Sequence, residues 1–160
     1  MVSERLRRLD RGGWTFVEVL LVVAIIGILA GMSIPLFVRY WQSAAVRAGA
    51  QEMRVGLQQA KQLAIRNRQN ICVFPVAPNG YRYLQNTCGG AAIVMPGTDG
   101  AGTFHLQQTN VTLACVTCPG GGITFRPLGD SAQGGTLSVT RLGGNPLNVR
   151  VTVAGQITTP

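Results

Sequence analysis

The sequence predicts an α+β fold in which one long N-terminal helix precedes an antiparallel β domain. A continuous apolar run from Trp14 to Val38 is followed by apolar residues at alternating spacings of four and three, as on one face of a helix. Beyond Arg68 the chain becomes a series of short β-rich segments separated by Gly, Pro and Asn. Charged residues make up only 12% of the chain and 21 of its 160 residues are glycine, which favours a turn-rich β domain over a coiled coil or a disordered chain.

We expect the helix to extend from about Thr15 to Arg68, with an amphipathic second part whose apolar stripe packs on the β domain. The stripe consists of Val46, Ala50, Met53, Leu57, Ala60 and Ala64. Gly49 and Gly56 should weaken this part, because glycine is a poor helix former. The expected organisation is a leader at residues 1–13, a transmembrane helix at 14–38, its amphipathic continuation at 39–69 and a globular β domain at 70–160.

The apolar run is long enough to cross a bilayer, since about 25 helical residues span roughly 37 Å. Four arginines precede it and should hold the N-terminus in the cytoplasm, so that the rest of the chain lies in the periplasm or outside the cell. They are Arg5, Arg7, Arg8 and Arg11. Gly27 and Gly31 lie four residues apart and suit close packing between membrane helices, although ordinary glycine usage in such helices explains them equally well.

Glu18 is an acidic residue inside this apolar run, where an unpaired carboxylate would cost several kcal/mol. The small residues Gly12 and Gly13 precede the run, whereas no small-residue cleavage site of an ordinary secretory signal follows it. Cleavage between Gly13 and Trp14 would therefore remove the leader, retain the helix and create a free amine that can pair with Glu18. The alternative is a plain signal anchor with an isolated glutamate.

The segment Gly13-Trp14-Thr15-Phe16-Val17-Glu18, followed by the apolar run, resembles the processing site of type IV pilins and pseudopilins. The resemblance covers about residues 12–38. It implies that a prepilin peptidase cleaves after Gly13 and methylates Trp14, which stands where phenylalanine is usual. It also implies that Glu18 directs subunit assembly and that Pro35 bends the helix.

Four cysteines follow the apolar run, and an even number in an oxidising compartment indicates two disulfides. They are Cys72, Cys88, Cys115 and Cys118. Of three possible pairings we favour Cys72 with Cys88 across a hairpin and Cys115 with Cys118 around a small loop. A zinc site would require two Cys/His doublets and only one is present, while a redox Cys-x-x-Cys would require a thioredoxin-like βαβ context that the pattern lacks.

The β domain is expected to contain strands at 70–76, 81–84, 91–95, 104–106, 111–115, 134–140 and 148–153, and an alternating segment at 123–129 that ends in a turn. Its last part resembles the globular domain of the H-type pseudopilin family (GspH/FimT), through the segments Ile123–Gly129, Leu137–Val139 and Val149–Ile157. This resemblance implies a minor pilin or pseudopilin that assembles with other pilins into a helical filament. Such a subunit primes or joins a type IV pilus or a type II secretion pseudopilus.

The formal charge of +8 suggests acidic partners, such as inner-membrane lipids or DNA. Residues recurring every seven positions form a basic row beside the apolar stripe, namely Arg47, Arg54, Lys61 and Arg68. The row supports two alternatives, contact with lipid head groups or binding of DNA during natural transformation. In DNA-binding relatives arginines lie near the terminal glycine motif, whereas residues 154–159 contain none.

We expect no enzymatic activity, metal or cofactor. The only histidine is His105, and no Ser/His/Asp set is visible. Asp99 and Asp130 lie in Gly-rich turns, where aspartate is common for conformational reasons. The resulting expectation is a single-pass inner-membrane protein with a periplasmic C-terminal domain, which then enters a pilus or pseudopilus.

Overall fold

The structure, a computed structural model, describes residues 15–108, 110–142 and 144–159. The chain divides into two compact units, residues 1–38 and residues 39–160. The expected cleavage site at Gly13 and Trp14 lies outside the described residues. The basic leader lies outside them as well.

One helix, α1 (Phe16–Asn67), accounts for the whole helical content expected from the sequence. Thr15 precedes its first residue, and the helix continues through Pro35. At its C-terminus Arg68 adopts a left-handed backbone conformation with φ of 52°. The Arg68 N–H donates to the carbonyl of Ile65 and the Gln69 N–H to that of Ala64. These two bonds form a Schellman motif, so α1 ends one residue before the expected boundary.

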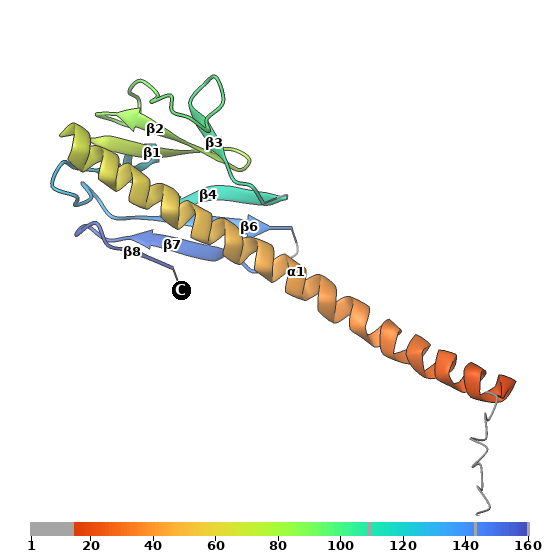
Figure 1. The fold of residues 1–160 in the computed structure, drawn as a ribbon. Coiled ribbons are helices and arrows are strands. Elements are labelled where there is room, and N and C mark those ends of the chain that lie inside the picture. Colours follow the sequence, from red (N-terminus) through yellow and green to blue (C-terminus); the bar gives the residue numbers. More distant parts are fainter. Residues whose placement is uncertain (1–14, 109, 143, 160) are drawn as a thin grey trace, which may run out of the picture. The chain divides into compact units, whose positions relative to one another are not determined.

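Among the described residues of the second unit, eight strands form two antiparallel four-stranded sheets (Figure 1). The first sheet has the order β3-β2-β1-β5 and the second the order β4-β6-β7-β8. The strands are β1 (Ile71–Val76), β2 (Gly80–Gln85), β3 (Thr103–His105), β4 (Val111–Thr117), β5 (Ile123–Phe125), β6 (Gly135–Arg141), β7 (Leu147–Val151) and β8 (Ile157–Thr158). A 3-10 turn, η1 (Pro119–Gly121), precedes β5.

Three strand expectations were wrong in detail. Residues 91–95 form no strand and make only an isolated bridge, because β3 already pairs with Gly80–Arg82 and leaves just the end of β2, at Leu84, for Ala92. β5 ends at Phe125, since the next residues turn back with the Gly129 N–H bonded to the carbonyl of Arg126. β7 ends at Val151, because a turn closed by Gly155 leads into the unexpected strand β8.

The hydrophobic core lies between the second part of α1 and both sheets, and the packing predicted for the apolar stripe is confirmed. Every stripe residue is buried. They face core residues of both sheets, such as Tyr83 and Phe125 from the first and Val139 and Val149 from the second. Figure 1 shows this part of α1 lying along the sheets, with β1 and β2 on one side and β7 and β8 on the other.

Candidate functional site

Glu18 lies in the first turn of α1, in the first unit, where its backbone is capped by Thr15. The Glu18 N–H lies 3.3 Å from the Thr15 hydroxyl oxygen and 3.0 Å from its carbonyl oxygen, and donates to both. Thr15 and Glu18 thus have the spacing of a capping box, which their positions in the sequence already indicate. The Glu18 side chain is exposed, so its carboxylate is accessible to a cation from outside the chain.

The apolar residues that follow are exposed throughout the first unit. Within the described chain, α1 contains the one segment long and apolar enough to cross a membrane, and none of that 18-residue window is buried. The space beside Gly27 and Gly31 is open, with no atom within 4 Å of where a Cβ would stand. An exposed apolar helix of this length needs a bilayer or other helices around it.

Two disulfides stabilise the globular unit, in the pairing that the sequence favoured. Cys72 in β1 is joined to Cys88 in the segment after β2, and Cys115 at the end of β4 is joined to Cys118. The first disulfide packs against Gly122, where a Cβ would lie 2.6 Å from the Cys72 Sγ. Any larger residue at position 122 would therefore displace the disulfide.

The basic row does not form a continuous free surface. Arg47 is exposed, but the Lys61 Nζ donates to the backbone carbonyl oxygen of Gly155 at 3.1 Å and so has a structural role. Arg54 is half-buried, and its Nε has no hydrogen-bond partner among the described residues. Arg68 lies beyond the end of α1. The seven-residue spacing places these residues on one side of the helix, but their exposure and their contacts differ.

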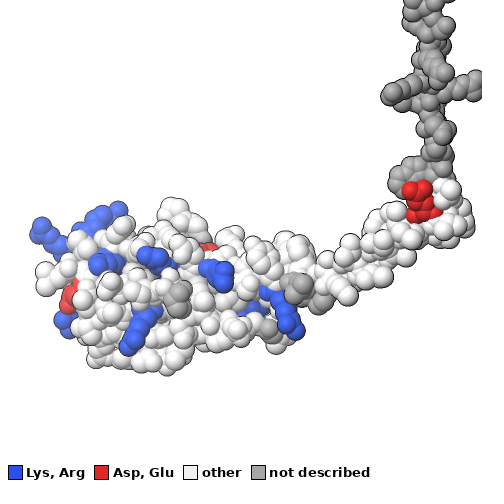
Figure 2. Space-filling model, turned by 90° about the horizontal axis from the view of Figure 1, so that it is seen from below, with Lys and Arg blue, Asp and Glu red and all other residues white. Residues whose placement is uncertain are grey.

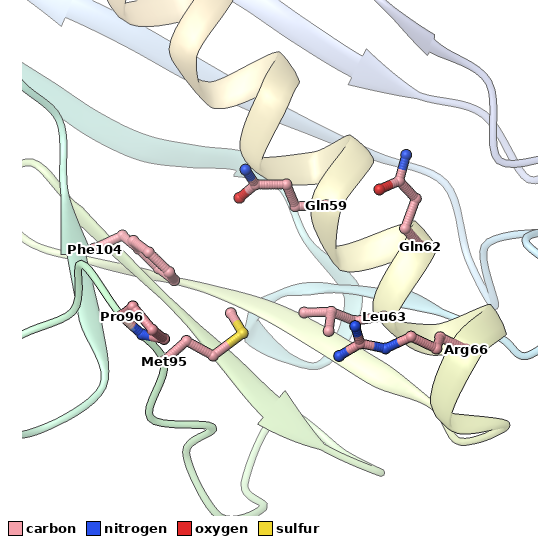
Figure 3. Close-up of a pocket in the computed structure, with 7 residues that line it drawn as sticks. All are labelled: Gln59, Gln62, Leu63, Arg66, Met95, Pro96 and Phe104. Carbon is pink, nitrogen blue, oxygen red and sulfur yellow. The ribbon is translucent and has the colours of Figure 1, made fainter.

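A shallow cavity of about 370 Å³ lies between the last turns of α1 and the segment before β3 (Figure 3). Leu63 and Met95 point toward one another across it, and Arg66 extends along the same rim. Its lining is completed by Gln59, Gln62, Pro96 and Phe104. An apolar floor with amide and guanidinium groups can bind a ligand but provides no nucleophile or general base. No local sequence pattern indicates this cavity, because its two walls are separated by about thirty residues along the chain.

The polar groups that could suggest catalysis have structural explanations. The Asp99 carboxylate accepts hydrogen bonds from the N–H groups of Thr103 at 2.7 Å and Ala101 at 3.0 Å, and these bonds, chiefly that of Thr103, hold its pKa below the usual range. His105 lies 3.4 Å from Asp99 in an exposed pair. Asp130 pairs with Arg126 at 3.3 Å. Within the described ranges no three His, Cys, Asp or Glu residues gather as a metal site would require.

A long helix packed on antiparallel sheets, with an apolar N-terminal part that carries an acidic residue in its first turn, defines a pilin-like protein. The family model described as "Type II transport protein GspH" matches residues 49–156, and the chain belongs to this family. The match begins within the stripe that packs α1 on the sheets and ends just before β8.

Solved pilin structures share this fold. The type IV minor pilin FimU of Pseudomonas aeruginosa is 16% identical and has a TM-score of 0.53, over 72% of this chain and 87% of that one. The minor pseudopilin EpsH from the type 2 secretion system of Vibrio cholerae is 17% identical and has a TM-score of 0.54, over 72% of this chain and 95% of that one. No curated protein sequence matches the chain.

Proposed function

We propose that this protein is a minor pilin or pseudopilin, a structural subunit that joins or primes a type IV pilus or a type II secretion pseudopilus. The proposal is supported chiefly by the presence, in one chain, of a GspH globular unit and an exposed apolar helix of membrane-spanning length. The apolar helix anchors the subunit in the inner membrane and then packs with other pilins in the filament core. The globular unit lies on the filament surface.

In this proposal a prepilin peptidase cleaves after Gly13 and methylates the new terminus at Trp14. The Glu18 carboxylate of one subunit then pairs with the terminal amine of a neighbour. A paired charge is tolerated in an apolar environment, and the requirement for pairing sets the register between subunits. The exposure of Glu18 supports this role, because among the described residues no hydrogen bond or ion pair engages its carboxylate.

The basic leader keeps the N-terminus in the cytoplasm and directs the globular unit to the periplasm. The two disulfides support this orientation, since they form and persist in oxidising compartments. Trp14 would then lie at the cytoplasmic side of the bilayer, where the peptidase would have to act.

The test is the intact mass and N-terminal sequence of the membrane-extracted protein, unreduced, from cells with and without prepilin peptidase. We expect a terminus at Trp14 only when the peptidase is present, a mass that includes one methyl group, and a deficit of four hydrogens for the two disulfides. A Gly13→Leu variant is the matched control and should remain uncut. A Met1 terminus in the presence of active peptidase would contradict the proposal.

DNA binding for natural transformation is the second candidate, and the charge of the globular unit favours it. Residues 39–160 contain ten Lys and Arg against three Asp and Glu. Figure 2 shows basic side chains spread over the face in view, while acidic ones are sparse. Retention of duplex DNA that falls steeply with salt would support this role. Equal retention by an Arg66→Gln/Arg68→Gln variant and by the unchanged chain would show that these exposed arginines take no part.

A further inference from the structure

The globular unit carries a cavity at the end that begins with Arg39. The cavity has a volume of about 550 Å³ and lies between α1 and the connection from β6 to β7. The helix contributes Arg39, Gln42, Ser43, Val46 and Arg47, the connection contributes residues 144–146, and β7 contributes its first residue, Leu147. The Gly144 N–H donates to the carbonyl of Arg141 at 2.9 Å, and a Cβ on Gly144 would lie 3.7 Å from Val46. The connection is therefore packed against the helix. We call Arg39, Arg47, Leu142 and residues 144–146 the hairpin foot.

The hairpin foot has an uncompensated positive charge. Arg39 and Arg47 are exposed, and no ion pair is present at either among the described residues. Arg141 adds a third cation at the end of β6, on the face that also carries the core residues Leu137 and Val139.

The three acidic side chains of residues 39–160 lie elsewhere. Glu52 accepts a hydrogen bond from the Gln107 N–H at 3.1 Å, Asp99 is bonded within its own loop and Asp130 pairs with Arg126. None of them lines the cavity. An anion that approached the hairpin foot would therefore meet no acidic side chain among the described residues that line its cavity.

The hairpin foot and the helix residues next to Arg39 also present apolar and aromatic groups to solvent. Leu142 is 94% exposed, although leucine is usually buried in a globular unit. Tyr40 and Trp41 follow Arg39 on α1 and are 69% and 61% exposed. Arginine together with tyrosine, tryptophan and an apolar tip is the combination found at the interface between a bilayer and water.

We propose that the hairpin foot docks on the anionic phospholipid head groups of the bilayer that the apolar part of α1 crosses. The inference rests on the proposed membrane anchoring. Arg39 directly follows Val38, the last residue of the apolar unit, and Arg47 is about 12 Å further along the helix. That distance is comparable to the Debye length, beyond which salt screens electrostatic attraction. Both arginines would therefore be attracted to a negatively charged membrane surface.

Nucleic acid also carries phosphates, but the exposed apolar tip distinguishes the two partners. Leu142 and Pro146 would gain nothing from a phosphate backbone in water, whereas they lose contact with water when they enter a head-group layer. Docking would hold the globular unit against the membrane until the subunit leaves for a filament.

The experiment places a single fluorophore in the hairpin foot of the full-length chain. Leu142→Trp is made in a Trp14→Phe/Trp41→Phe background, so that the only tryptophan reports on the tip. The protein is reconstituted into vesicles of phosphatidylcholine alone or of phosphatidylcholine and phosphatidylglycerol in equal amounts. Flotation with the vesicles reports anchoring, and an unreduced mass with both disulfides reports folding. Quenching by brominated lipid then reports docking.

We expect flotation with both lipids, but a blue-shifted emission and strong quenching only with phosphatidylglycerol. Arg39→Gln/Arg47→Gln should weaken docking about 25-fold, because each arginine near an anionic surface contributes about a factor of five. The matched control Arg66→Gln/Arg68→Gln removes the same charge from exposed positions at the far end of α1 and should leave the quenching unchanged.

Flotation without quenching in either lipid would overturn the docking inference and leave the membrane anchor intact. A chain that fails to float would overturn both. A blue shift produced by duplex DNA with phosphatidylcholine vesicles, and not by phosphatidylglycerol, would assign the hairpin foot to nucleic acid instead.

Discussion

Lys61 in α1 and Gly155 in the turn before β8 are joined by a hydrogen bond, with the Lys61 Nζ 3.1 Å from the Gly155 carbonyl oxygen. A Cβ on Gly155 would collide with the Gly129 carbonyl oxygen, and its φ of 73° suits glycine. The bond thus attaches the helix to a turn that only a small residue can form. Lys61 belongs to the packing of the globular unit, even though its sequence spacing groups it with Arg47, Arg54 and Arg68.

Lys61→Met should therefore destabilise the globular unit. The substitution keeps most of the aliphatic side chain but leaves the Gly155 carbonyl without its charged donor. We expect a loss of about 1 kcal/mol in the free energy of unfolding. Denaturant unfolding of the full chain in detergent measures it. Arg47→Met is the control, because Arg47 is exposed, and it should change stability by less than about 0.5 kcal/mol. Equal effects of the two substitutions would contradict a structural role for Lys61.

Gly56→Ala should also destabilise the protein, although alanine is the better helix former by about 1 kcal/mol. The new Cβ would lie 2.7 Å from the Tyr81 hydroxyl oxygen and 2.8 Å from its Cζ. Tyr81 cannot easily move, since its ring is buried and stacks on Phe104 at 5.4 Å. Overpacking of this kind costs about 1–3 kcal/mol, which exceeds the gain in helix propensity.

The midpoint of thermal unfolding checks the Gly56 prediction. Gly100→Ala is the matched control, because the space beside Gly100 is open. It should leave the midpoint within about 2 °C of the unchanged chain. A Gly56→Ala variant that is more stable than the unchanged chain would show that Tyr81 gives way.

The same helix shows which features the sequence could predict. A stripe at helical spacing was enough to predict the buried face of α1, because burial of that stripe depends on the period and not on the partner. Gly56 was interpreted only as a weak point of the helix, because its contact with Tyr81 involves a strand 25 residues away and cannot be inferred from the helix pattern. The bond between Lys61 and Gly155 links residues 94 positions apart and leaves no local pattern. Strand β8 was missed because its two residues are too few to show alternation.

Tyr83 should make the globular unit less stable at alkaline pH than at neutral pH. Its hydroxyl donates to the Gly56 carbonyl at 2.7 Å, and burial, followed by interaction with Tyr81, raises its pKa well above the ordinary value of 10.0. The folded state keeps this proton at a pH where the unfolded chain releases it. The stability that Tyr83 contributes is therefore fully present below pH 10.0 and falls as the pH rises beyond it.

Tyr83→Phe should cost about 1 kcal/mol at neutral pH through the lost hydrogen bond, and should make the alkaline decline in stability shallower. Unfolding curves measured from neutral pH to above the ordinary tyrosine pKa check both effects. Tyr40→Phe, at an exposed position, should change neither. An unchanged alkaline slope in Tyr83→Phe would show that another group titrates.

The two disulfides should differ in their effects on stability. Cys72 and Cys88 are 16 residues apart, so their bond should stabilise the fold by about 3 kcal/mol through restriction of the unfolded chain. Cys115 and Cys118 are three residues apart, and the same argument gives about 2 kcal/mol. Cys72 is also fully buried, whereas Cys115 is exposed. Denaturant unfolding of the two Cys→Ala double variants should rank Cys72/Cys88 as the more damaging. The reverse order would show that residual structure in the unfolded chain outweighs loop length.

Glu18 has two possible roles that one substitution can separate. As the acidic partner of a neighbour's terminal amine it needs a negative charge. As the third residue after the Thr15 cap it needs only a side chain that can accept a hydrogen bond from the backbone of the preceding turn, which glutamine provides equally well.

Glu18→Gln should therefore preserve the start of α1 and membrane insertion, yet reduce filament incorporation nearly as much as Glu18→Leu. Glu52→Gln, a neutralised carboxylate in the globular unit, is the control and should be incorporated normally. Co-purification with sheared filaments, set against the amount in the membrane, measures the effect. Normal incorporation of Glu18→Gln together with failure of Glu18→Leu would assign Glu18 to helix capping and remove charge pairing from the assembly mechanism.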